Sequence, residues 1–172
     1  MKYTTMLWVT FSSVLLCACT QSSVDLKAEQ EAFRAAAHAD ALVGVWRLVE
    51  RSNWDSSGAL VQNFGQNPIG YFVHDRTGHF SVQIMRTPAI HTSAEEPDTP
   101  TQSELREHFQ DYYAGFGTYT VDSMSSESVY RIEGSTRPQL IGTEARLPYR
   151  IESDSLIIGD GKTWHRVWQR LR

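Results

Sequence analysis

The chain has 172 residues, the usual length of one domain, with 16 Lys and Arg against 20 Asp and Glu and a formal net charge of −4. This mildly acidic balance argues against a nucleic-acid-binding surface, which needs clustered basic residues. A composition that is 41% hydrophobic and 11% aromatic excludes a largely disordered chain and supplies a packed core.

Few residues are available for metal or covalent chemistry. Both cysteines, Cys17 and Cys19, lie near the N-terminus, so the remainder of the chain has no disulfide, thiolate metal site or cysteine nucleophile. The six histidines form no H-x-H or H-x-x-x-H pair, and no G-x-S-x-G motif is present. We therefore expect no metal and no cofactor.

The first 18 residues are typical of a lipoprotein signal peptide. Lys2 is followed by an apolar stretch over 6–16, which is shorter than the roughly 20 residues of a membrane-spanning helix. The run 16–19, Leu-Cys-Ala-Cys, resembles the bacterial lipobox, in which a lipid such as palmitate is attached to the last cysteine. We expect the mature chain to begin at Cys19 and to be held on a membrane by that lipid. An ordinary secretory leader is the alternative.

Thr20 follows the lipidation site, and residues 20–24 are small and polar, as in a flexible tether. By resemblance to the sorting rules of Gram-negative lipoproteins, a residue other than Asp after the cysteine favours the outer membrane over retention at the inner one. The expected location is the periplasmic face of the outer membrane. Residues 25–41 predict a helix, because they are rich in Ala and Glu and contain no Gly or Pro. This helix would either pack loosely on the domain or act as a stalk. Together with the tether it forms one N-terminal segment, residues 19–41.

From residue 42 to the C-terminus the pattern changes to short strands separated by turns. In 79–86, Phe80, Val82 and Ile84 alternate with polar residues, which is the period of a strand with one buried face. The stretch 87–101 predicts a long loop, and Ser103 is expected to cap a short helix over 104–113. Strands are predicted at 43–51, 71–74, 79–86, 116–122, 128–134, 141–151, 155–158 and 163–171. The fold class is therefore all-β, a single up-and-down antiparallel barrel of about eight strands.

Two features carry a resemblance to the calycin and lipocalin superfamily. Gly44-Val-Trp46 matches the G-x-W of its first strand, and the last strand offers Arg166 and Arg170 as candidates to stack on that tryptophan. Over about 42–171 the chain is similar to the bacterial lipocalin-like domain family, through motifs that include those at 67–71, 116–119 and 142–144. The resemblance implies a barrel closed at one end by Gly44, Trp46 and Arg166. One departure is Tyr130-Arg131, where the family often has histidines.

Candidate ligand-binding residues come from two groups. Aromatic side chains could line a pocket or simply form the core, and they are Tyr71, Phe80, Tyr112, Tyr113, Phe116 and Tyr119. Four charged residues, Glu133, Arg137, Glu144 and Arg146, could meet inside the barrel and hold a polar ligand group, or could form surface pairs instead. The segment 87–113 would then lie beside the mouth as a lid.

These observations favour a membrane-anchored protein that binds a small apolar molecule, such as a lipid or fatty acid, without covalent chemistry. The oligomeric state is left open. One alternative is a barrel isomerase or cyclase that uses Tyr119, Glu133 and Arg146 for proton transfer and charge stabilisation. Another is a structural envelope lipoprotein whose barrel is filled by its own side chains. Whether the protein is an enzyme therefore stays open at the level of the sequence.

Overall fold

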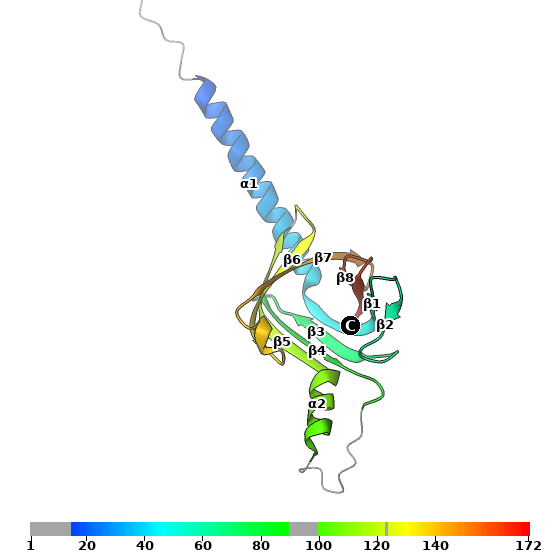
Figure 1. Cartoon of the computed structure of the whole chain (residues 1–172). Helices are drawn as coiled ribbons and strands as arrows, with labels where there is room; N and C mark the ends of the chain where they lie inside the picture. Colours follow the sequence, from blue (N-terminus) through cyan, green and yellow to red (C-terminus); the bar gives the residue numbers. More distant parts are fainter. Residues whose placement is uncertain (1–14, 90–99, 123) are drawn as a thin grey trace, which may run out of the picture.

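The computed structural model describes residues 15–89, 100–122 and 124–172, with side chains from residue 25 onward. An N-terminal helix leads into an antiparallel sheet that is interrupted once by a second, shorter helix (Figure 1). The elements are, in order, α1 (Leu15–Leu42), β1 (Gly44–Trp54), β2 (Leu60–Val61), β3 (Ile69–His74), β4 (His79–Met85), α2 (Gln102–Asp111), β5 (Tyr112–Asp122), β6 (Glu127–Ser135), the 3₁₀ turn η1 (Pro138–Leu140), β7 (Glu144–Glu152), β8 (Ser155–Gly159) and β9 (Trp164–Arg170).

The sheet closes on itself into a barrel of eight strands. Each of the strands β3 to β9 pairs with its sequence neighbour, β1 pairs with β3, and β9 returns to pair with β1. The short strand β2 pairs only with the end of β1, opposite Asn53 and Trp54. All pairings are antiparallel, which confirms the predicted all-β, up-and-down barrel. Closure leaves the sheet without long free edges.

Strand positions agree with the sequence to within a few residues, with one exception near α2. The predicted helix over 104–113 is observed as Gln102–Asp111, and β5 begins directly after it at Tyr112. Thr101, and not Ser103, is the N-cap. Its hydroxyl accepts from the Glu104 amide, and the Glu104 carboxylate accepts from the Thr101 amide, which together form a capping box. Part of the predicted loop, 90–99, lies outside the described residues.

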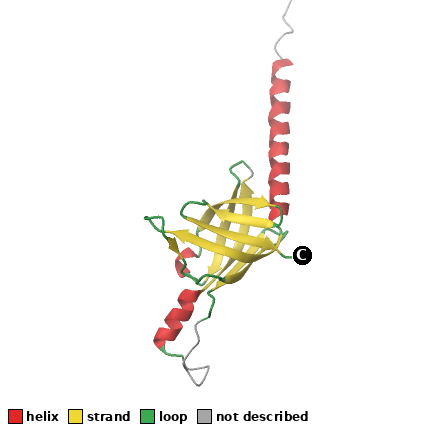
Figure 2. Ribbon diagram, turned by 90° about the vertical axis from the view of Figure 1, so that its right-hand side faces the viewer, coloured by secondary structure: helices red, strands yellow, loops and turns green. Residues whose placement is uncertain are grey.

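Helix α1 is longer at its N-terminus than predicted. It includes Cys19 and the stretch 20–24 that was expected to be an irregular tether, while residues 1–14 of the predicted leader lie outside the described part. The helix projects away from the barrel (Figures 1 and 2), and Leu26 and Phe33 are 65% and 76% exposed. Of the two alternatives, a stalk describes it better than a packed helix. Within the described residues no helix is long and apolar enough to cross a membrane.

The two ends of the barrel differ. Helix α1 joins one end and α2 stands at the other (Figure 2). The antiparallel order places Gly44, His74 and Arg170 at the α1 end, which we call the closed end. The opposite end, near α2 and η1, is called the mouth. Large buried side chains concentrate in the closed half, where they include Leu42, Trp46, Phe72, Phe80, Tyr119, Tyr130 and Trp168.

Candidate ligand-binding site at the barrel mouth

The closed end is sealed by a stack of Arg170 on Trp46. The Arg170 guanidinium carbon lies 4.0 Å from the centre of the Trp46 ring, and its two terminal nitrogens each donate, at 2.5 Å, to the carbonyls of Ala41 and Val43. Glycine suits position 44, because its backbone φ of +143° is one that other residues rarely adopt and because a Cβ there would lie 2.8 Å from an Arg170 nitrogen. Such a stack combines a cation–π contact with charged hydrogen bonds.

The prediction that Arg166 closes the barrel is therefore wrong, whereas Gly44 and Trp46 lie at the closed end as expected. Strand β9 runs antiparallel to β1 with Arg170 opposite Trp46 and Arg166 opposite Arg51. Arg166 consequently lies near the mouth, where its guanidinium is 5.3 Å from the ring of Trp164. The sequence makes both Arg166 and Arg170 candidates for the stack on Trp46, and only the register between β1 and β9 decides between them.

Aromatic packing fills the barrel above this seal. His74 is 1% exposed and its Nε2 lies 2.9 Å from the Tyr130 hydroxyl, while its ring packs against Phe72 and Tyr119. Burial lowers the pKa of His74 to about 3 and raises the pKa of Tyr130 well above its ordinary value. The Tyr119 hydroxyl donates to the carbonyl of Asp75 at 3.0 Å. These polar atoms belong to the buried aromatic core of the closed half.

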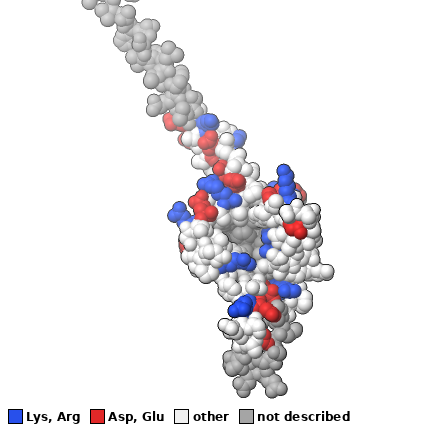
Figure 3. All heavy atoms as spheres, viewed as in Figure 1, with Lys and Arg blue, Asp and Glu red and all other residues white. Residues whose placement is uncertain are grey.

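The mouth half is hollow. A cavity of about 680 Å³ opens there, which we call the mouth cavity, and it is visible as a hollow with Lys and Arg atoms at its edge (Figure 3). Its lining residues are Arg51, Asn53, Asn63, Phe64, Ile84, Arg86, Phe109, Gln110, Asp111, Tyr113, Arg137, Gln139, Leu140 and Arg166. The described residues thus form a barrel that is filled at one end and open at the other.

A β-bulge in β1 turns Arg51 into this cavity. Trp46 and Leu48 point inward, and strict alternation would place Glu50 inward as well. The register shifts between Leu48 and Glu50, however, so that Val49 and Glu50 both face outward and Arg51 faces inward, opposite Arg166. Bulges commonly redirect a side chain in this way. Sequence reasoning missed Arg51 because the alternation of a regular strand places it on the outside.

Three arginines of the cavity differ in how they are held. Arg166 donates to the carbonyl of Ser52 at 2.8 Å and to Oδ1 of Asn53 at 2.9 Å. The Arg51 guanidinium lies 4.1 Å from the centre of the Phe64 ring, and its buried Nη1 has no hydrogen-bond partner among the described residues. Desolvation, together with the charge of a neighbouring arginine, lowers the pKa of Arg51 and of Arg166 to about 10. Both groups therefore remain charged at neutral pH.

The third arginine, Arg137, immediately precedes η1, and its guanidinium lies 5.8 Å from the centre of the Tyr113 ring. Burial raises the pKa of the Tyr113 hydroxyl, and the nearby Arg137 charge opposes that effect. The single carboxylate of the mouth cavity, Asp111, is engaged by Arg86 at 3.3 Å. Positive charge thus exceeds negative charge among the lining residues.

The predicted interior cluster of four charged residues does not form. On β6 the inward positions are Tyr130 and Ile132, so Glu133 faces outward. On β7, Glu144 and Arg146 are exposed and form a surface ion pair of 3.2 Å. Arg137 alone of the four lines the mouth cavity, because it follows the end of β6 and is not part of the strand.

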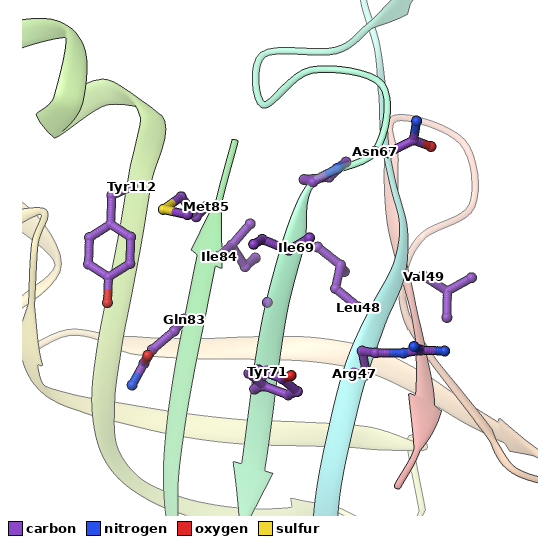
Figure 4. A pocket seen from close by; sticks show the side chains of 12 residues that line it. Arg47, Leu48, Val49, Asn67, Ile69, Tyr71, Gln83, Ile84, Met85 and Tyr112 are labelled. Carbon is purple, nitrogen blue, oxygen red and sulfur yellow. The ribbon is translucent and has the colours of Figure 1, made fainter. Parts of the chain in front are cut away.

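The predicted aromatic set is divided between three locations. Phe80 and Tyr119 are buried in the closed half, and Tyr113 lies in the mouth cavity. Tyr71 and Phe116 lie on the outer surface of the barrel, where they are 51% and 56% exposed. Tyr112 also lies on the outer surface. Tyr71 and Tyr112 border a shallow hollow of about 500 Å³ across β1, β3, β4 and the start of β5 (Figure 4).

The three residues considered for catalysis are not brought together. Tyr119 is buried in the core at the closed half, whereas Glu133 and Arg146 lie on the outer surface. Within the described ranges, no three His, Cys, Asp or Glu residues are grouped so that they could hold a metal ion. The mouth cavity is lined mainly by polar and charged side chains, with Phe64, Ile84, Phe109 and Leu140 as its apolar part. Because it is larger than the outer hollow and opens into the barrel, it is the candidate site for a small molecule.

Comparison with known proteins agrees with this architecture. The family model described as "lipocalin-like domain" matches residues 43–170, which spans all eight barrel strands. No curated protein matches the chain. Barrels of this size hold side chains or one small ligand, and this one is filled by side chains at one end and hollow at the other. From the match together with the closed barrel, we conclude that the chain belongs to the lipocalin-like domain family.

Proposed function

We propose that this protein is a membrane-anchored lipoprotein whose barrel binds one small apolar molecule, such as a lipid or fatty acid. The observation that carries the proposal is the mouth cavity, whose volume of about 680 Å³ lies above the buried aromatic core of the closed half. Ligand sites of small molecules typically have volumes of roughly 300–1,000 Å³, a range that includes this cavity. The buried core forms the floor of this cavity.

The apolar walls of the cavity come from separate parts of the chain. Phe64 is contributed by the connection between β2 and β3, Ile84 by β4, and Leu140 by η1. Burying the apolar surface of a ligand against such side chains contributes roughly 25 cal/mol for each Å² removed from water. An acyl chain presents apolar surface along its whole length, which supports it as the class of ligand.

Two neighbouring substitutions in η1 and just after it test this binding site. Leu140 is half-buried and lines the cavity, whereas Ile141 is 49% exposed and does not. Leu140→Trp would place a larger side chain in the cavity, and we expect at least a tenfold loss of affinity for a fluorescent fatty-acid probe. Ile141→Trp is the matched control and should bind like the unmodified chain. Equal affinity in both variants, with the probe bound, would place the ligand elsewhere.

Anchoring through Cys19 is the second part of the proposal, and the lipobox-like run 16–19 supports it. Helix α1 continues from Cys19 to Leu42, which at 1.5 Å per residue corresponds to about 35 Å. With lipid on Cys19, this helix would act as a spacer that holds the barrel away from the bilayer. Thr20, following the cysteine, favours the outer membrane and its periplasmic face.

Fractionation of cells that express the full chain tests the anchor. Cys19→Ser should move the protein from the membrane fraction to the soluble fraction and abolish incorporation of labelled palmitate. Cys17→Ser is the matched control, two residues away, and should leave the protein in the outer-membrane fraction of a density gradient. Membrane association that survives Cys19→Ser would refute lipidation at this residue.

A further inference from the structure

The mouth cavity contains an arrangement of charge that binding of a purely apolar molecule does not explain. Arg51 and Arg166 lie directly opposite each other on paired strands, with both side chains directed into the cavity. Like charges in such cross-strand positions destabilise a sheet. Arg137 lies close enough to lower the pKa of Arg51 further. Of the four arginines that line the cavity, only Arg86 is paired with a carboxylate of a described residue, so the other three cations call for a compensating interaction.

The described protein residues do not supply that interaction. Neither Arg51 nor Arg137 makes a side-chain hydrogen bond or ion pair with any described residue, and Nη1 of Arg51 is buried without a partner. Asp111 is already engaged by Arg86. A buried charged donor that lacks an acceptor costs free energy, which a bound acceptor would recover.

The positions of the three groups suit one kind of acceptor. Arg166 is held in place by hydrogen bonds to the backbone of Ser52 and to the side chain of Asn53. The Arg51 guanidinium rests on the Phe64 ring, 4.1 Å from its centre, so that the ring covers one face of the guanidinium plane. A guanidinium presents paired donors in a fork that matches the two oxygens of a carboxylate or phosphate.

We propose that the ligand is an amphiphilic anion, whose oxyanion head group binds Arg51, Arg137 and Arg166 while its apolar tail lies against Phe64, Ile84 and Leu140. This inference rests on the proposed function, because it assigns chemistry to the ligand of the same cavity. The head group is a carboxylate or a phosphate, which present the same oxygens to an arginine fork. A neutral apolar molecule would leave the three charges uncompensated.

Three probes with the same twelve-carbon tail separate the head group from the tail: dodecanoate, dodecyl phosphate and dodecanol. With the full chain, we expect one or both anions to bind at least tenfold more tightly than the alcohol by calorimetry. Affinity confined to dodecanoate identifies a carboxylate ligand, and affinity confined to the phosphate identifies a phosphate ligand. Binding of the alcohol that equals both anions would overturn the inference.

Substitution of the arginines localises the effect. Arg51→Gln should weaken binding of the preferred anion at least tenfold and leave dodecanol unchanged. Arg47→Gln is the matched control, since Arg47 is on the same strand but faces outward, and it should not alter either affinity. Arg137→Gln is the second variant. Its side chain is exposed and makes no described hydrogen bond or ion pair, only a contact with the Tyr113 ring, so the fold should be retained even if Arg51→Gln impairs folding.

The outcomes distinguish this inference from the proposed function. If all three probes bind, Leu140→Trp blocks them and the arginine variants have no effect, the cavity binds apolar molecules and the anion inference fails. If none of the three probes binds the folded chain, both the binding function and the inference fail. Loss of anion binding in Arg51→Gln and Arg137→Gln, with dodecanol retained, supports both.

Discussion

His74 links the packing of the closed half to pH. Its pKa is lowered to about 3 by burial, compared with about 6.5 for an exposed histidine. Between these two values the unfolded chain binds a proton that the folded chain does not bind. The free energy of unfolding therefore falls as the pH drops below about 6.5, and by pH 5 the loss from this residue reaches about 2 kcal/mol.

A double substitution isolates this contribution. Replacing both partners of the 2.9 Å contact, His74→Phe with Tyr130→Phe, keeps the shape of the core while removing the titrating ring. We expect the unmodified chain to lose about 2 kcal/mol of unfolding free energy between pH 7.5 and pH 5, and the double variant to lose much less. Urea titrations at the two pH values measure this. Tyr130→Phe alone, the control, should retain the full pH dependence, and a double variant that still shows it would assign the effect to other groups.

At the same scale, two arginines of β9 have different roles that only their neighbours reveal. Arg170 stacks on Trp46 and bonds to the backbone that follows α1, whereas Arg166 faces the mouth cavity. The side chains are four residues apart and therefore on the same face of the strand. Residue type and periodicity are identical for both, so the distinction depends on which end of the barrel each one occupies.

At the scale of elements, the bulge at Val49 determines what the mouth cavity contains. Val49 has no partner on β9, since Leu48 pairs with Trp168 and Glu50 with Val167. Removing an unpaired residue leaves the pairing of Arg51 with Arg166 unchanged and converts β1 into a regular strand. Removing a paired residue instead moves every later side chain to the opposite face.

Two single-residue deletions test this view of β1. Deletion of Val49 should leave a folded barrel that has lost only about 1–2 kcal/mol and still binds its ligand. Deletion of Arg47, two residues earlier in the regular part of the strand, should abolish cooperative unfolding, because the inward Leu48 would then face outward. Circular dichroism and thermal melts of both variants provide the measurement. Equal damage from the two deletions would show that the bulge itself is required.

At the scale of the whole molecule, the barrel and the projecting part of α1 are structurally separable. Residues 25–30 are all exposed, whereas the last turns contact the barrel through a 2.9 Å bond between His38 and the Tyr149 hydroxyl and through fully buried Leu42. The carbonyl of Leu42 also accepts from the Trp46 indole nitrogen at 2.8 Å. The contribution of α1 to the stability of the barrel therefore comes from the C-terminal part of the helix.

Shortening the chain from its N-terminus should accordingly leave its stability unchanged until the contacts made by the last turns of α1 are lost. A chain that begins at Glu31 should melt within about 2 °C of the full chain and bind the same probes with the same affinity. A chain that begins at Val43 loses Leu42 and the His38 contact, and should be destabilised by about 3 kcal/mol or more. Differential scanning calorimetry compares the three. A large effect of the shorter truncation would contradict the role of the projecting half as a spacer.

The sequence by itself determined the fold class, because alternation in stretches such as 79–86 and turn residues such as 75–78 are local signals. It also identified Gly44 and Trp46, which form a short motif, and Arg137, which follows the end of β6. The capping box at Thr101 was likewise readable from its spacing to Glu104, although Ser103 was chosen. Each of these features depends on neighbours along the chain.

Only the tertiary structure decided which charged residues share the cavity. A regular strand pattern cannot reveal an extra residue at Val49, so it places Arg51 outside the barrel, and it leaves open whether Glu133, Glu144 and Arg146 lie in the interior or on the surface. Nor can it reveal that β9 closes against β1 with Arg170, not Arg166, opposite Trp46. Register and bulges are set by the sum of long-range packing around the closed barrel, and a shift of one residue reverses the direction of every side chain that follows.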